Sequence, residues 1–114
     1  MSNDFQISVN HIVDIAVISI VGDVTDTSNK VIGDTYNRDK VLNSPKILLK
    51  FDNDCYIDSG GLVAIIDIAI EGHKRGQKIN ACGLSDHFQK IFYMVGLTRF
   101  IHVFSSQEDA INDF

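Results

Sequence analysis

The feature that most constrains the fold is a set of short apolar runs separated by helical patterns. Ile15–Val21 is nearly continuous and rich in β-branched residues, and Lys46–Phe51 is a second run of this kind. Such runs are typical of strands buried on both faces, as in the parallel sheets of α/β proteins. Residues 77–83 and Ile101–Phe104 predict two more strands, and helices between them would complete right-handed βαβ units.

A different kind of strand is expected before Ile15. Phe5, Ile7 and Val9 alternate with polar residues, and a period of two is typical of a strand with one buried face. Residues 10–14 are polar enough for a turn. The chain is therefore expected to open with a hairpin.

About four helices are expected among the later strands. The first is predicted over residues 28–42, and it must end before Pro45 because the residue before a proline avoids helical dihedral angles. The second follows the junction at residues 58–61 and ends at Gly76, a residue suited to a helix C-terminus. Its inward stripe is expected to consist of Leu62, Ile65, Ile66, Ala69 and His73.

The last two helices follow the same logic. One begins at Ser85 or Asp86 and ends at Gly96, with apolar residues spaced three and four apart. The other begins in a capping-box pattern at residues 105–108. The residues expected to face inward on these two helices are Phe88, Ile91, Phe92, Val95, Ala110, Ile111 and Phe114. Phe88, Phe92 and Met94 fit either the core or a groove for a partner.

Composition excludes several classes of function. With 114 residues and a net charge of −5, the chain is expected to form one domain and to lack the clustered cations of a nucleic-acid binder. His73, Lys74 and Arg75 form its one basic run, which fits the end of a helix. The apolar stretch over residues 62–70 is too short to span a membrane. No secretory signal is evident, so a cytoplasmic location is expected.

No catalytic or metal-binding pattern is found. Cys55 and Cys82 have no redox or ligand spacing and are expected to be reduced thiols, and Asp54 and Asp58 should disfavour a Cys55 thiolate. No elbow motif surrounds Ser59, and no glycine pattern for nucleotides is present. The four histidines share no ligand spacing, and the acidic residues 52–58 fit a solvated loop better than a calcium site. We therefore expect no enzyme activity, metal or cofactor.

The residues with the clearest functional meaning are Asp58-Ser59-Gly60-Gly61-Leu62, at a junction between a strand and a helix. Free N–H groups at a helix start stabilise negative charge, and glycines allow a tight turn and the close approach of a partner. The junction therefore predicts a docking point in which Ser59 is a candidate for phosphorylation. The alternative is that Ser59 only caps the helix and that the glycines serve turn geometry and close packing, which we favour for Gly61.

Over its whole length, residues 1–114, the chain resembles a STAS domain, the fold of sulfate-transporter domains and anti-sigma factor antagonists. Four segments carry the resemblance: Gly22-Asp23-Val24-Thr25, residues 46–51 leading to Ile57-Asp58-Ser59-Gly60-Gly61-Leu62, Met94-Val95-Gly96-Leu97, and residues 104–110. The resemblance implies a single α/β domain with a mixed sheet, helices mainly on one face and the opening strand at an edge.

In stand-alone bacterial members, the resemblance implies partner switching. The unmodified domain binds a serine-kinase anti-sigma factor, the kinase phosphorylates a hydroxyl in the loop, and a metal-dependent phosphatase resets it. By this resemblance the partner-binding residues here are Asp23, Val24, Thr25, Asp58, Ser59, Gly60, Gly61 and Leu62.

Two positions depart from the family pattern. The usual acceptor hydroxyl is replaced by Gly60, and Thr25 stands where an aspartate is common. Either Ser59 is a displaced acceptor, or the domain has escaped control by a kinase. Two further hypotheses stay open: a scaffold or accessory subunit of a membrane transport or signalling complex, and a weak nucleotide-binding module.

Overall fold

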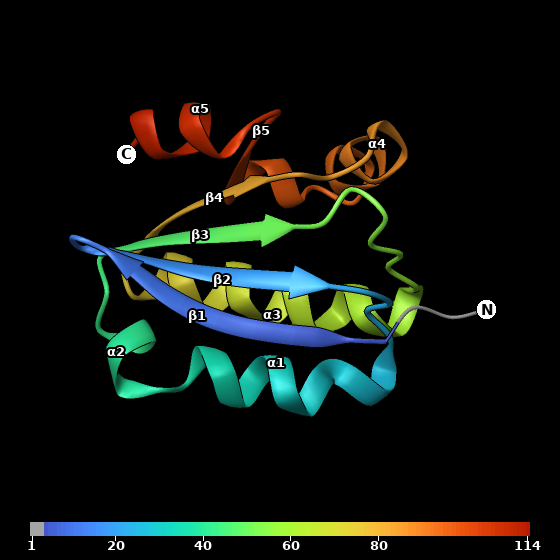
Figure 1. Ribbon diagram of the computed structural model, residues 1–114, viewed down its shortest axis with the longest axis horizontal. Coiled ribbons are helices and arrows are strands. Elements are labelled where there is room, and N and C mark those ends of the chain that lie inside the picture. The colour runs from blue at the N-terminus through green and yellow to red at the C-terminus, as the bar shows by residue number, and fades with distance from the viewer. Residues whose placement is uncertain (1–3) are drawn as a thin grey trace.

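The computed structural model describes residues 4–114 and places five strands in one sheet in the order β1-β2-β3-β4-β5 (Figure 1). The strands are β1 (Gln6–Ile12), β2 (Ile15–Val21), β3 (Lys46–Phe51), β4 (Lys78–Cys82) and β5 (Ile101–Phe104). The α-helices are α1 (Asn29–Tyr36), α2 (Asp39–Leu42), α3 (Ser59–Lys74), α4 (Asp86–Met94) and α5 (Gln107–Asn112). Two 3₁₀ turns complete the chain, η1 (Asp26–Ser28) and η2 (Leu97–Arg99).

The sheet is mixed, as the sequence predicts. β1 pairs antiparallel with β2 and occupies one edge, whereas β2, β3, β4 and β5 are parallel neighbours. Parallel strands must be joined by crossovers, and helices supply them here. The carboxyl ends of β2 and β3 therefore lie side by side, together with the loops that follow them (Figure 1).

The opening hairpin is tighter than we predicted. We expected a turn over residues 10–14, but β1 continues to Ile12, and Asn10 pairs with Val17 across the ladder. Only Val13 and Asp14 make the turn, and Val13 has a positive φ of 56°. The polar residues at the end of β1, Asn10 and His11, were misleading because both are exposed side chains of an edge strand.

The predicted helix over residues 28–42 is broken into α1 and α2, and η1 precedes α1. Arg38 is extended between the two α-helices, and Tyr36 and Val41 are buried on either side of the break. Gln77 stabilises the break, since its Nε2 donates to the carbonyls of Val41 and Leu42 at 3.2 and 3.0 Å while its Oε1 accepts from the Tyr36 hydroxyl at 2.6 Å.

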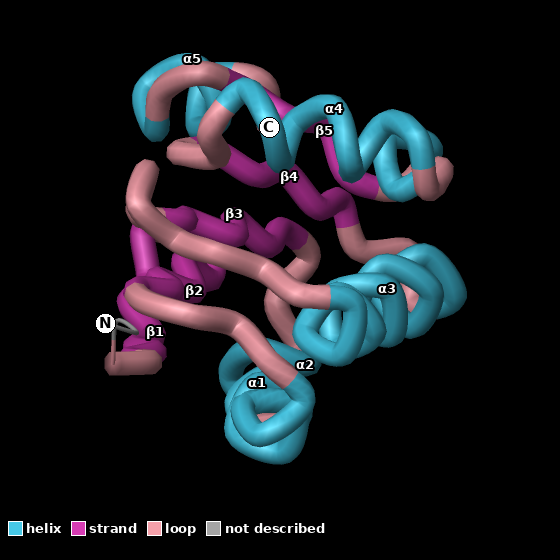
Figure 2. Tube along the Cα trace, turned by 90° about the vertical axis from the view of Figure 1, so that its right-hand side faces the viewer, coloured by secondary structure: helices cyan, strands magenta, loops and turns pink. Residues whose placement is uncertain are grey.

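The helices cover mainly one face of the sheet, as expected. The larger core lies between the sheet and α1, α3 and α4, and a smaller one lies under α5 on the opposite face (Figure 2). On α3 the buried residues are Gly61, Ala64, Ile65, Ile68, Ala69 and Gly72. His73, which we placed in the inward stripe, is exposed and packs its ring edge-on against Phe100.

Polar side chains fix α5 to the sheet. Asn80, fully buried on β4, donates from Nδ2 to the Ala110 carbonyl at 2.9 Å and to Asp113 Oδ2 at 3.1 Å. Lys78 pairs with the same carboxylate at 3.1 Å. Hydrogen bonds from Lys78 and Asn80 hold the pKa of Asp113 below its usual value. The N-cap of α5 is Ser106, one residue later than the capping pattern indicated.

Candidate partner-docking site

The loops after β2 and β3 are joined by backbone hydrogen bonds. Val24 and Ile57 form a parallel bridge, in which the Val24 N–H donates to the Tyr56 carbonyl at 2.7 Å and the Asp58 N–H donates to the Val24 carbonyl at 3.1 Å. The bridge extends the β2–β3 pairing beyond the strands. It brings the two predicted halves of the site together, although they are more than 30 residues apart in the sequence.

Asp58, not Ser59, caps α3. The Asp58 backbone is extended and its Oδ1 accepts from the Gly61 N–H at 2.8 Å, which satisfies one of the free donors of the helix start. Ser59 is the first helical residue and is exposed. Within residues 4–114 its hydroxyl makes no hydrogen bond, so the capping alternative for Ser59 is wrong.

Gly61 is required by close packing. A Cβ at this position would lie 2.1 Å from the Val24 carbonyl oxygen and 2.5 Å from the carbonyl carbon. These are backbone atoms held by the bridge to Ile57, so they cannot move aside easily. The predicted structural role of Gly61 is therefore confirmed.

Gly60 is also closely packed, as the structural alternative for the two glycines predicted. A Cβ here would lie 2.8 Å from Asp26 Cβ and 3.1 Å from the Asp26 nitrogen. Asn29 Nδ2 donates to the Gly60 carbonyl at 2.9 Å. The η1 turn and the start of α1 thus rest on Gly60, so a side chain at position 60 requires this segment to shift.

The segment over Gly60 is itself well fixed. Ser28 Oγ donates to the Thr25 carbonyl at 2.8 Å and accepts from the Thr25 N–H at the same distance, and the Thr25 and Thr27 hydroxyls are hydrogen-bonded at 2.8 Å. Ser28 is buried. The contact between Asp26 and Gly60 therefore joins the backbone of η1 to the backbone of α3, and movement of the Asp26 side chain alone would not relieve it.

Cys55 supports the site as a neutral thiol. It is buried, and its Sγ donates to the Gly22 carbonyl at 3.0 Å. Burial raises the pKa of Cys55 to about 12, with smaller effects from Asp52 and Asp23. The sequence predicted that the Cys55 thiolate is disfavoured. The main cause is burial, however, and the contributing aspartates are Asp52 and Asp23 instead of Asp54 and Asp58. Burial also raises the pKa of Cys82.

The eight predicted contact residues differ in accessibility. Val24 and Gly61 are buried, so they can only shape the surface. Ser59 is exposed, and Leu62 and Gly60 are partly exposed. Asp23, Thr25 and Asp58 are also partly exposed. The accessible surface thus combines acidic and hydroxyl groups from two loops with the first turn of α3.

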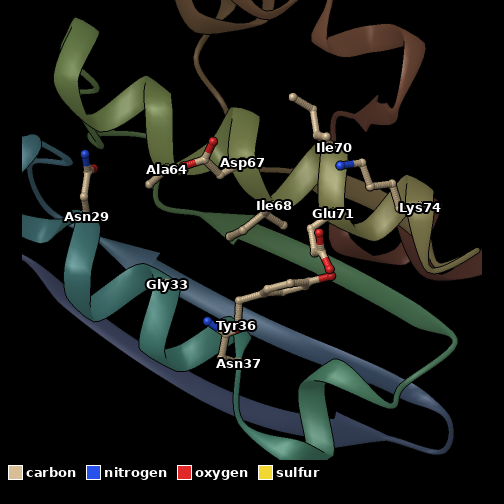
Figure 3. A pocket seen from close by; sticks show the side chains of 10 residues that line it. All are labelled: Asn29, Gly33, Tyr36, Asn37, Ala64, Asp67, Ile68, Ile70, Glu71 and Lys74. Atoms are coloured by element: carbon tan, nitrogen blue, oxygen red, sulfur yellow. The ribbon is translucent and has the colours of Figure 1, made fainter.

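A groove of about 470 Å³ lies between α1 and α3, and Figure 3 shows the side chains that line it. Asn29, which also bonds Gly60, stands at one end of it, while Gly33 and Ala64 leave it open. Asp67, Glu71 and Lys74 give its α3 wall two carboxylates and one ammonium group. No group of three metal-ligating side chains occurs in residues 4–114, and none of the helices there is long and apolar enough to cross a membrane.

A family model for the STAS domain matches residues 6–110. The chain belongs to the STAS domain family. The comparison with curated proteins gives no match. The structure confirms the predicted α/β class, the mixed sheet and the edge position of β1, and the family match confirms the resemblance.

Solved structures show the same fold at low identity. An anti-sigma factor antagonist from Mycobacterium paratuberculosis is 14% identical, with a TM-score of 0.75 over 96% of this chain and 93% of that chain. The anti-sigma factor antagonist SpoIIAA in its unphosphorylated form is 14% identical, with a TM-score of 0.70 over 96% of each chain. The Bacillus cell fate determinant SpoIIAA in its phosphorylated form is 16% identical, with a TM-score of 0.63 over 96% of this chain and 98% of that chain.

Proposed function

We propose that this STAS domain is a regulatory binding protein of the anti-sigma factor antagonist type, which acts by binding and not by catalysis. The observation that carries the proposal is the bridge between Val24 and Ile57, because it joins two loops into one surface around the exposed Ser59. The similarity to anti-sigma factor antagonists supports the same role. Its site of action would be the cytoplasm.

The proposed partner is a serine-kinase anti-sigma factor that docks on Asp23, Thr25, Asp58, Ser59 and Leu62. These side chains offer carboxylates and hydroxyls around an apolar group, which suits a partner surface with cationic and apolar groups. Binding would release the sigma factor from its inhibitor and so regulate transcription. A metal-dependent phosphatase would be a second partner only if the loop is phosphorylated.

Ser59 is the proposed phosphorylation site, because position 60 has no hydroxyl and is packed against Asp26. A phosphate on the first residue of α3 would be stabilised by the helix dipole. It would nevertheless weaken docking, since a dianion would lose its hydration against the partner. Phosphorylation at Ser59 would therefore switch the interaction off without unfolding the domain.

The test is capture of partners from a lysate of the source organism with ATP and magnesium, followed by intact-mass measurement of the domain. We expect a serine kinase to be captured and a gain of one phosphate at Ser59. Ser59→Asp should reduce capture at least about tenfold, in the range of an interface hot spot, whereas Ser59→Ala should bind but gain no mass. Equal capture by Ser59→Asp would place the interface elsewhere.

A second candidate is a scaffold or accessory subunit of a membrane transport or signalling complex. The packing of Asp26 on Gly60 favours it, because the surface then lacks an acceptor at position 60. Capture of permease or ATPase subunits, with no gain in mass and no kinase, would support this role. Capture of a kinase without a gain in mass would instead indicate an antagonist that the kinase does not inactivate.

A further inference from the structure

The outer side of β1 is an unpaired strand edge. β1 is the first strand of the sheet, and within residues 4–114 it pairs only with β2. In an antiparallel ladder, alternate residues direct their N–H and C=O groups away from the neighbouring strand. Apart from the pairing with β2, no backbone hydrogen bond of the described residues reaches β1. Figure 2 shows α1 and α2 on the face that α3 also covers, so these helices do not continue the sheet beyond β1.

This edge lacks the features that usually prevent further pairing. Edge strands are commonly protected by a charged residue, a proline, a bulge or a short length. β1 has seven residues, and none of them is Asp, Glu, Lys, Arg or Pro. Its pairs with β2 run without a bulge, from Gln6 with Val21 to Ile12 with Ile15. The edge thus carries no fixed charge although the chain has a net charge of −5, and it is open to a further strand.

We propose that this further strand is β1 of a second copy of the chain, which pairs antiparallel across a twofold axis at Ser8. The axis places Ser8 opposite Ser8 and Ile7 opposite Val9. It also places Gln6 opposite Asn10. Ser8, Gln6 and Asn10 are exposed and polar, whereas Ile7 and Val9 pack against the larger core. Each pair therefore joins side chains of the same kind, as a stable strand pair requires, and both copies use the same surface.

The charges beside β1 favour this axis over its neighbour. An axis at Ser8 places Asp4 opposite an apolar residue. An axis at Val9 would instead bring Asp4 beside Asp14 of the second copy, and like charges that face each other destabilise a strand pair. Lys46, which pairs with Asp14 at 3.1 Å, would only partly offset this repulsion. An axis one residue earlier than Ser8 would leave the last residue of β1 without an opposite residue among those described.

A hollow of about 330 Å³ lies beside β1 where the second copy would end. Val9 and His11 line it from the strand, and residues 38–41 line it from α2 and the residue before it. Phe5 is partly exposed and, like Val9, packs against the larger core, so the two lie on the same face of the sheet. The pairing places Phe5 of the second copy opposite His11. The exposed part of that ring would therefore lie beside the hollow.

The pairing keeps the two docking sites around Ser59 apart. Gln6 pairs with Val21, so each β1 begins next to the end of β2, from which one of the docking loops emerges. Antiparallel pairing of the two β1 strands therefore puts the docking sites at opposite ends of the joined sheet. The dimer would present two equivalent sites. Its formation does not depend on the role proposed for Ser59, and Ser59→Asp should leave it unchanged.

The first test is disulfide trapping of the full-length domain with oxidised glutathione. Opposite residues of an antiparallel pair have Cα atoms about 4.5–5.5 Å apart, which a disulfide can span. Ser8→Cys should therefore form a covalent dimer. Gln6→Cys should not do so alone, because its two copies would lie four residues apart, about 13 Å along the strands, but it should form a mixed dimer with Asn10→Cys. The parent domain, whose two cysteines are buried, controls for other disulfides.

The second test is sedimentation equilibrium of the domain without trapping, over a series of concentrations. We expect the parent to form a dimer. Ser8→Lys opposes two ammonium groups at the axis and should weaken the dimer at least about tenfold. Ser19→Lys is the matched control, because Ser19 is the residue of β2 that pairs with Ser8 and lies one strand further from the edge. It should leave the dimer nearly unchanged.

Three results would overturn the proposal. One is a parent domain that stays monomeric at every concentration, including one that binds an unrelated strand at β1, since the edge would then have a different occupant. Another is a dimer that Ser8→Lys weakens no more than Ser19→Lys does, which would place the interface elsewhere. The third is trapping of Gln6→Cys as efficient as that of Ser8→Cys, which would exclude a defined axis at Ser8.

Discussion

The start of α3 and the docking of α5 hold the fold together in opposite ways. At the start of α3, two glycines let backbone meet backbone, and Val24 and Asp26 fill the space that side chains would need. Under α5, a buried amide and a carboxylate hold the helix through Asn80 and Asp113. The first contact depends on the missing side chains of Gly60 and Gly61, whereas the second depends on the charge of Asp113 and the polarity of Asn80.

The two regions should therefore respond differently to pH and to substitution. Packing of backbone on backbone does not titrate, so the close contact of Gly61 with the Val24 carbonyl should not itself depend on pH. A carboxylate with a lowered pKa loses its interactions in acid, so the α5 contact should weaken there. The glycine packing beneath the proposed docking surface should thus be less sensitive to pH but more sensitive to substitution than the α5 contact.

The largest effect is expected for Gly61→Ala. The added Cβ meets the Val24 carbonyl at 2.1 Å, and this backbone cannot retreat without breaking the bridge to Ile57. We expect a loss of about 3 kcal/mol in the free energy of unfolding, at the upper end of overpacking effects. Urea unfolding measures it.

Gly33→Ala is the matched control for this comparison. It also replaces a glycine within a helix, but nothing lies within 4 Å of the added Cβ. Removing a helical glycine should stabilise the domain by about 0.5–1 kcal/mol. If both variants lost similar stability, the clash with Val24 would not be the reason.

A smaller loss is expected for Gly60→Ser, the substitution that restores a hydroxyl at the usual acceptor position. Its Cβ would lie 2.8 Å from Asp26 Cβ, and η1 must shift, so we expect a loss of about 1–2 kcal/mol. Asp26→Gly removes the opposing Cβ. The double variant should therefore recover about 1 kcal/mol of the combined losses in a double-mutant cycle, and strict additivity of the two single changes would exclude this packing pair.

The sequence predicted the strands better than the contacts between loops. Ile15–Val21 and Lys46–Phe51 were predicted with correct bounds because buried parallel strands leave continuous apolar runs. The helix over residues 28–42 was wrong because its break depends on Gln77, a residue just before β4 that satisfies carbonyls of α2.

For the candidate site, local pattern indicated Ser59 and the glycines but not what covers Gly60. Asp26 and Asn29 looked like ordinary residues of a helix start, and their contacts with Gly60 span more than 30 positions. Such a contact leaves no periodic signal in a single sequence. The cap was misassigned for a related reason, since Asp58 and Ser59 are both good N-cap residues and only the backbone angles decide between them.

The smallest effect concerns the pH dependence of the α5 contact. The folded-state pKa of Asp113 is lowered, first by hydrogen bonds from Lys78 and Asn80, so its stabilising effect is present above the unfolded pKa of about 3.9 and is lost as the pH falls through the folded pKa. Asp113→Asn lacks this contribution at every pH. The difference in urea midpoint between the parent domain and Asp113→Asn should therefore be constant near neutral pH. It should shrink as the pH falls into the acid range.

Asp67→Asn provides the control for the acid titration. It removes an exposed carboxylate that forms no ion pair within residues 4–114, so its difference from the parent should not close in the same way. The α5 contact would be confirmed as the acid-sensitive region if hydrogen exchange in α5 and β4 rose in acid before exchange in the first turn of α3. If the α3 start opened first, the contrast between the two regions would be wrong, because the backbone contacts of Gly60 and Gly61 would then be the weaker of the two.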